Sequence, residues 1–161
     1  RGLSDKPDST GPERKTDVQF KPANPNFAEV VRGSFATQGL MQLIGATLER
    51  VEPGAIDIAL PFRDDLTQQH AFLHGAVTTA IADSAAGYAA LSLMPAGNEV
   101  LSVEFKINLL RPAVGSRFIA EGRVVKAGKT ITVSSANVFA YADDQPVHIA
   151  TLLATMISQK G

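Results

Sequence analysis

The stretch His74-Gly75-Ala76-Val77-Thr78-Thr79-Ala80-Ile81-Ala82-Asp83-Ser84-Ala85-Ala86-Gly87 decides how the rest of this chain folds. Its residues are almost all small or apolar, which predicts a helix that is packed closely on all sides. The one carboxylate, Asp83, is costly to bury in such a helix unless partners stabilise it. Asp83 is therefore either an acid retained for chemistry or a structural one, paired with a neighbouring strand or solvated on one helix face.

Length and composition limit the classes of protein that this chain can be. Its 161 residues suffice for one domain with a real core, and 45% hydrophobic with 19% charged residues is typical of a soluble globular protein. A net charge of −1 provides no basic field for nucleic acid and no polybasic patch for a membrane. The absence of cysteine excludes disulfides, thiolate chemistry and cysteine zinc sites, and is compatible with a cytoplasmic location, which we expect.

The first part of the chain differs in character from the rest. Residues 1–25 are polar and interrupted by four prolines, so they cannot bury enough surface to fold alone. They also lack the apolar core of a signal peptide, and no stretch of the chain is apolar for long enough to span a membrane. We expect a polar N-terminal arm at 1–25 and one folded domain at 26–161.

Several elements are predicted before and through the central stretch. We expect a short helix at 26–34, an apolar segment at 39–45, and two strands joined by the turn Glu52-Pro53-Gly54. The second strand alternates apolar and polar residues, the pattern of a half-buried strand. A loop at 63–72 then leads to a helix that begins at His74 and ends near Leu93.

The remainder of the chain predicts strands at 100–110, 118–126, 130–141 and 147–158. We expect the first three to form an antiparallel meander, with Leu101, Val103, Phe105, Ile107 and Leu109 as the apolar set of the first. Because one long apolar helix must be covered on several sides, the sheet has to wrap around it. The predicted fold class is α+β with one central helix.

Common catalytic and ligand-binding motifs are absent. Gly128-Lys129-Thr130 is not a phosphate loop, since the glycine required five residues earlier falls on Arg123. No Gly-x-Ser-x-Gly occurs, and His70, His74 and His148 lack metal-ligand spacing. We expect neither a metal nor a cofactor.

One segment nevertheless carries a family resemblance. Leu73-His74-Gly75-Ala76 followed by Ala82-Asp83-Ser84-Ala85-Ala86-Gly87 resembles the signature of the PaaI-like acyl-CoA thioesterases of the hotdog fold, and the likeness extends over about 39–157. It implies an antiparallel sheet around one long helix, hydrolysis of acyl-CoA without metal, and homodimers that often pair into homotetramers. The family's usual His-Gly-Gly is His-Gly-Ala in this chain.

The resemblance also implies roles for five residues. Asp83 matches the family's helix carboxylate, which acts as nucleophile or general base. Gly75 matches the glycine whose backbone N–H polarises the thioester carbonyl. Gln68 matches a loop position near the attacking water or the carbonyl, His74 the histidine that shapes the loop, and Ser102 a polar strand position near the carboxylate.

The spacing of two of these residues predicts an assembly. Gly75 lies at the start of the helix, where unpaired N–H groups and the helix dipole favour negative charge. Eight residues at 1.5 Å each separate it from Asp83 by about 12 Å, so one carbonyl cannot contact both within one helix. We therefore expect a dimer in which Asp83 of one subunit faces Gly75 of the other. In a monomer, Gly75 would simply begin the helix.

The sequence offers several residues that could contact the substrate and does not choose among them. Cations available for the coenzyme A nucleotide are Arg63, Arg111, Arg123, Lys126 and Lys129. Residues suited to contact the acyl group are Phe72, Ala86, Tyr88 and Leu91. Two other functions remain possible: a hotdog hydratase or dehydratase, which needs a catalytic His–Asp pair, and a non-catalytic acyl-CoA sensor, which normally carries a DNA-binding segment.

Overall fold

The helix α3 (Gly75–Leu91) is the centre of the fold in a computed structural model of the chain, which describes residues 20–143 and 145–161. The helix begins where the His74 side chain accepts a hydrogen bond from the Ala76 N–H. It ends at Ser92, whose hydroxyl donates to the Ala89 carbonyl (2.6 Å) and accepts from the Gly54 N–H (2.7 Å). Within the described ranges, no helix is long and apolar enough to span a membrane.

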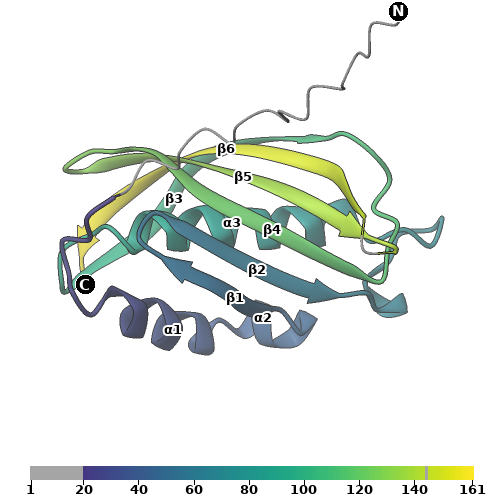
Figure 1. Cartoon of the computed structure of the whole chain (residues 1–161), viewed down its shortest axis with the longest axis horizontal. Coiled ribbons are helices and arrows are strands. Elements are labelled where there is room, and N and C mark those ends of the chain that lie inside the picture. Colours follow the sequence, from purple (N-terminus) through teal and green to yellow (C-terminus); the bar gives the residue numbers. More distant parts are fainter. Residues whose placement is uncertain (1–19, 144) are drawn as a thin grey trace, which may run out of the picture.

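Six antiparallel strands curve around α3 (Figure 1). They are β1 (Thr47–Glu52), β2 (Ala55–Pro61), β3 (Asn98–Leu109), β4 (Arg117–Ala127), β5 (Ile131–Tyr141) and β6 (Pro146–Lys160). Their order in the sheet is β1-β2-β4-β5-β6-β3. This arrangement confirms the α+β fold with a sheet wrapped around one helix, the hotdog fold.

The predicted meander is wrong in one respect. The three strands that follow one another in the sheet are β4, β5 and β6, whereas β3 leaves β4 and pairs with β6 at the sheet edge. The loop at 110–116 allows β3 and β4 to separate, because it is long enough to carry the chain across the end of the sheet.

A glycine permits the close contact between α3 and the middle of the sheet. A Cβ atom at Gly122 of β4 would lie 2.2 Å from the carbonyl oxygen of Ala85. No side chain fits there, so the helix backbone rests directly on β4. The same close approach leaves room only for small side chains on this face of α3. Ala85 and Ala86 lie there and are fully buried.

The N-terminal helices lie beside the sheet. α1 (Phe27–Thr37) and α2 (Gly39–Ile44) are found near β1 in Figure 1, and a single-turn helix, η1 (Asp64–Leu66), precedes the loop before α3. Of the predicted polar arm, residues 1–19 lie outside the described part of the chain. Phe20 packs against the core, beside Gly54 in the turn between β1 and β2.

The edge strand β3 does not present its apolar set on one face. A β-bulge between Ser102 and Glu104 shifts the alternation, so Ser102 and Phe105 both lie opposite buried residues of β6, Met156 and Ala154. The expected common face is therefore wrong. Large apolar side chains are exposed along this edge: Leu101 (50%), Val103 (55%), Phe105 (42%) and Leu109 (58%).

Candidate active site

The start of α3 leaves one backbone donor free. His74 Nδ1 accepts from the Ala76 N–H at 2.9 Å, and the His74 carbonyl accepts from the N–H groups of Val77 (2.9 Å) and Thr78 (3.1 Å). The Gly75 N–H, by contrast, has no partner among the described residues. The first turn of α3 therefore offers a single backbone donor, with the positive end of the helix dipole behind it.

The loop before α3 is a tight hairpin that fixes Gln68. The Gln68 N–H donates to the Phe72 carbonyl (2.9 Å), and the Ala71 N–H donates to the Gln68 carbonyl (3.0 Å). Ala71 has a φ of +61°, the left-handed conformation that such three-residue turns require. The Gln68 side chain accepts from the His70 N–H through Oε1, which leaves its amide NH₂ as the free end.

Gly75 and Gln68 both line a cavity of about 420 Å³. Most of its wall is apolar, from Phe72, Leu73, Leu109 and Ile149, and Arg111 also borders it. Thr78, one turn into α3, contributes to the wall and is 1% exposed. Its hydroxyl is buried and has no hydrogen-bond partner among the described residues.

Asp83 lies two helical turns further along α3 and is held by a strand. The Ser102 hydroxyl of β3 donates to Asp83 Oδ1 at 2.7 Å and lies 3.4 Å from the Met156 sulfur. Asp83 is only half-buried, so the residue keeps contact with solvent. Oδ2 has no partner within the described ranges and is free to act on a substrate.

Asp83 and Ser102 line a second, smaller cavity of about 180 Å³. Other walls come from α1, the residue that joins α1 to α2, and the next turn of α3: Ser34, Gln38, Ser84 and Tyr88. Ser34, Gln38 and Ser84 are not among the site residues predicted from the sequence. Polar residues on α1 have the pattern of a solvated helix face, so no local signal separates them from ordinary surface.

The predicted site residues thus fall into two groups in one chain. Gly75 and Gln68 share the larger cavity, Asp83 and Ser102 share the smaller one, and about 12 Å of helix separates the two groups. The His74 side chain lines neither cavity, since its ring caps the helix. Ala76, where the family has glycine, has no positive φ and carries the N–H that His74 caps.

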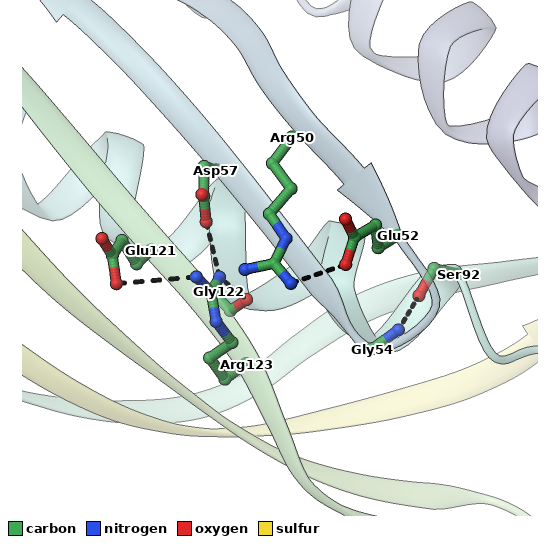
Figure 2. Close-up of polar contacts among 8 residues, drawn as sticks. All are labelled: Arg50, Glu52, Gly54, Asp57, Ser92, Glu121, Gly122 and Arg123. Carbon is green, nitrogen blue, oxygen red and sulfur yellow. Dashed lines mark hydrogen bonds and ion pairs between the residues drawn. The ribbon is translucent and has the colours of Figure 1, made fainter. Parts of the chain in front are cut away.

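The structure narrows the set of candidate cations. Arg123 is bound on the sheet by Asp57 (2.5 Å) and Glu121 (3.5 Å), as Figure 2 shows. Arg63 is bound by Asp65 and by the Leu43 carbonyl, and its guanidinium lowers the pKa of Asp65. Arg111 is the candidate that borders a cavity, where its side chain donates to the His148 carbonyl at 2.9 Å.

Some of the residues expected to contact the acyl group line a cavity, and others are buried in the core. Phe72 lines the larger cavity and Tyr88 the smaller one. Ala86 is fully buried under β4 next to Gly122, so the expectation that it contacts the acyl group is wrong. Leu91 is also buried, at the far end of α3.

No group of three or more metal-ligating side chains is found among residues 20–143 and 145–161. His74 caps α3, and His148 stacks on Phe139 with Nε2 2.9 Å from the Ala150 carbonyl. These two histidines therefore serve local structure.

Comparison with known proteins supports the same family. The sequence profile of the thioesterase superfamily matches residues 70–147. A thioesterase family protein from Silicibacter pomeroyi has a solved structure that is 44% identical, covers 84% of this chain and 99% of its own, and superimposes with a TM-score of 0.83.

Two more distant structures share the fold alone. The Escherichia coli PaaI protein of the phenylacetic acid degradation operon is 18% identical with a TM-score of 0.76, and covers 84% of this chain and 95% of its own. A thioesterase from Haemophilus influenzae is 17% identical with a TM-score of 0.72, covering 79% and 87%. The family profile and the 44% identical thioesterase family protein show that the chain belongs to the thioesterase superfamily, and the two distant structures share its hotdog fold.

Proposed function

We propose that this protein is an acyl-CoA thioesterase in which Asp83 is the nucleophile or general base. The observation that carries the proposal is the Asp83 carboxylate, held at 2.7 Å by Ser102 at the wall of a cavity while its second oxygen is free. A carboxylate fixed in this way can act on a substrate carbon or on a water.

The chemistry requires a donor for the carbonyl oxygen as well. In the base route, Asp83 takes a proton from water, the resulting hydroxide attacks the thioester carbon, and the C–S bond breaks to release the CoA thiolate. In the nucleophile route, Asp83 attacks the thioester carbon, and the C–S bond breaks to release the CoA thiolate and leave a mixed anhydride. Water then hydrolyses the anhydride to the free acid and restores the Asp83 carboxylate. In both routes the carbonyl oxygen gains negative charge, and the Gly75 N–H at the start of α3 is suited to stabilise it.

Gln68 adds a second donor in this proposal. Its Oε1 is occupied by the His70 N–H, so the amide NH₂ is the end that can reach the carbonyl oxygen or hold the water. His74 acts indirectly: by capping the Ala76 N–H it leaves the Gly75 N–H as the donor that faces substrate.

A homodimer is part of the proposal, because one chain keeps Gly75 and Asp83 about 12 Å apart. The β3 edge supports it, since an edge strand with a free outer side in the described sheet and with exposed Leu101, Val103 and Leu109 is a surface that a second copy can cover. Two copies joined here, with their α3 helices antiparallel, form two shared sites. The family resemblance extends this to a tetramer of two dimers, and we propose a cytoplasmic location from the composition.

The larger cavity is suited to the pantetheine arm of CoA. Its walls are mainly apolar, and Arg111 at its border is a cation for the phosphates of the nucleotide. Gly75 shares that wall with Leu109, and a Cβ atom at Gly75 would lie 2.8 Å from Leu109 Cδ1.

A hydratase is less well supported. The roles of His74 and His148 in capping and stacking leave neither paired with a carboxylate. A non-catalytic acyl-CoA sensor differs from the thioesterase in turnover alone, so a measurement of turnover separates the two.

The test is release of free thiol from a panel of acyl-CoAs. We expect hydrolysis by the unchanged protein, a loss of at least about a hundredfold in kcat in Asp83→Asn and Asp83→Ala, and an unchanged fold by circular dichroism. Asp64→Asn, which changes an exposed carboxylate of η1, is the matched control and should retain activity. Near-normal hydrolysis by Asp83→Ala would exclude the assigned role, and binding of acyl-CoA without thiol release would favour the sensor.

A further inference from the structure

The smaller cavity beside Asp83 has a polar lining that the proposed chemistry does not use. Besides Asp83 and Ser102, it is lined by side chains that carry hydroxyl or amide groups: Ser34, Thr37, Gln38, Ser84 and Tyr88. Val100 is the one branched apolar side chain in the lining. The larger cavity has the opposite character, because aromatic and aliphatic residues make most of its wall.

The geometry of α3 extends this cavity away from the reacting carbon. Gly87 follows Asp83 by four residues, so it lies on the same helix face, about 6 Å further along. Because Gly87 has no side chain, the space beside Asp83 continues along the helix to Tyr88. An acyl group whose carbonyl carbon is at Asp83 can therefore direct its far end toward Tyr88.

Tyr88 is held with its hydroxyl among polar partners. The residue is 3% exposed, its ring packs edge-on against Phe35 at 5.8 Å, and its hydroxyl oxygen lies 3.2 Å from Ser34 Oγ. Burial raises the pKa of Tyr88, and hydrogen bonds with Ser34 and Gln38 oppose this only in part. The phenol therefore stays protonated at neutral pH and can donate.

Ser84 and Gln38, two other polar side chains of this lining, are also held by a hydrogen bond. Ser84, next to Asp83, donates its hydroxyl to Gln38 Oε1 at 3.3 Å. Gln38 thereby connects the chain after α1 to α3, beside the Tyr88 hydroxyl. These groups are already oriented in the protein alone, so a substrate does not need to order them.

We infer that this cavity receives the far end of the acyl group and selects short acyl-CoA thioesters that carry a hydroxyl or carbonyl oxygen about 7.5 Å from the thioester carbon, which is the helical rise from Asp83 to Tyr88. The inference rests on the proposed thioesterase function and adds the substrate class to it. Ser34 and Tyr88 can bond such an oxygen. A saturated alkyl chain of the same size would displace solvent from this polar lining without offering a hydrogen-bond partner in its place, which lowers the rate for that substrate.

The experiment compares two substrates of nearly equal shape, 6-hydroxyhexanoyl-CoA and heptanoyl-CoA, which differ by a hydroxyl in place of a methyl group. We expect kcat/KM for the hydroxylated substrate to exceed that for heptanoyl-CoA by about tenfold, the value of one good hydrogen bond. In Tyr88→Phe and in Ser34→Ala the ratio should fall toward one. Ser34 is exposed on α1, so its variant is not expected to disturb folding.

A matched control is available because the chain has two tyrosines. Tyr141 is at the end of β5 and lines neither cavity, so Tyr141→Phe should leave the ratio unchanged. Equal or faster hydrolysis of heptanoyl-CoA, or an unchanged ratio in both site variants, would overturn the substrate class while thiol release still supports a thioesterase. Absence of thiol release from any acyl-CoA would instead refute the proposed function, and this inference with it.

Discussion

The Ser102 hydroxyl donates a hydrogen bond to Asp83 Oδ1 at 2.7 Å, which ties the carboxylate of the central helix to the edge strand β3. Ser102 reaches the helix because it lies immediately before the β-bulge and opposite buried Met156. This bond fixes which carboxylate oxygen is occupied. It therefore sets the direction in which Asp83 can attack or accept a proton.

Removing this hydroxyl should lower activity through the position of Asp83. In Ser102→Ala we expect kcat to fall about tenfold with a smaller change in KM, because the carboxylate loses its orientation and one charge-assisted bond. Steady-state thiol release measures both constants. Ser116→Ala, which removes an exposed hydroxyl that donates to the Tyr141 carbonyl and lines neither cavity, is the control; an equal kcat loss in both variants would argue against a specific role for Ser102.

Activity should depend on the chemical group at the free end of the Gln68 side chain. We expect Gln68→Ala to cost about tenfold in kcat/KM, less than the loss of Asp83, and Gln68→Asn to be partly tolerated. Gln68→Glu keeps an oxygen for the His70 N–H but replaces the NH₂ donor with a charged oxygen, so it should be worse than Gln68→Ala. If Gln68→Glu were as active as the unchanged protein, the amide would not be a donor to the substrate.

The buried hydroxyl of Thr78 should reduce stability. Because Thr78 Oγ1 has no partner in the described part of the chain, Thr78→Val should raise the free energy of unfolding by about 1 kcal/mol. Denaturant unfolding at fixed protein concentration measures the change. Thr79→Val is the control with the opposite sign, since the Thr79 hydroxyl donates to the Gly75 carbonyl at 2.7 Å. A loss of stability in Thr78→Val would show that the hydroxyl has a structural partner.

Two glycine substitutions should also change stability in opposite directions. Gly122→Ala should destabilise the fold by about 2 kcal/mol or more, because the new methyl group would overlap the Ala85 carbonyl. Gly33→Ala in α1 meets no atom within 4 Å and should stabilise the protein by about 1 kcal/mol through helix propensity. Thermal unfolding of the two variants compares them directly, and a neutral Gly122→Ala would mean that α3 is not fixed on β4.

The sequence predicts the central helix and the strands because their patterns are local. The apolar run from Gly75 and the turn at Gly54, with φ of +74°, are examples. Strand pairing is not local: nothing within 98–109 indicates that β3 pairs with β6 rather than β4. The bulge at Val103 is equally hidden, because it places one residue outside an alternation that looks regular in the sequence.

The candidate site, too, is predicted from the sequence only where its residues belong to one local pattern. The spacing of Gly75 and Asp83 on one helix indicates a site shared between subunits, since helical rise depends on sequence distance alone. The hydroxyls of Ser34 and Tyr88 meet across 54 residues, which no pattern within either helix reveals. Side chains of a site that come from an outer helix therefore need the structure.

The most direct test of the shared site is subunit complementation. Asp83→Ala removes the carboxylate, and Gly75→Pro removes the N–H at the first helical position, where proline is tolerated. The extended His74 backbone, with ψ of 137°, also suits a residue that precedes proline. Each variant alone should form an inactive homodimer.

In a mixed dimer of the two variants, one site combines both defects and the other has neither. We therefore expect each mixed dimer to regain about half the activity of the unchanged dimer. The measurement is thiol release after the inactive homodimers exchange subunits, with exchange followed by mass-tagged chains. Recovery supports a site built from Asp83 of one subunit and Gly75 of the other, whereas no recovery despite demonstrated exchange would contradict it.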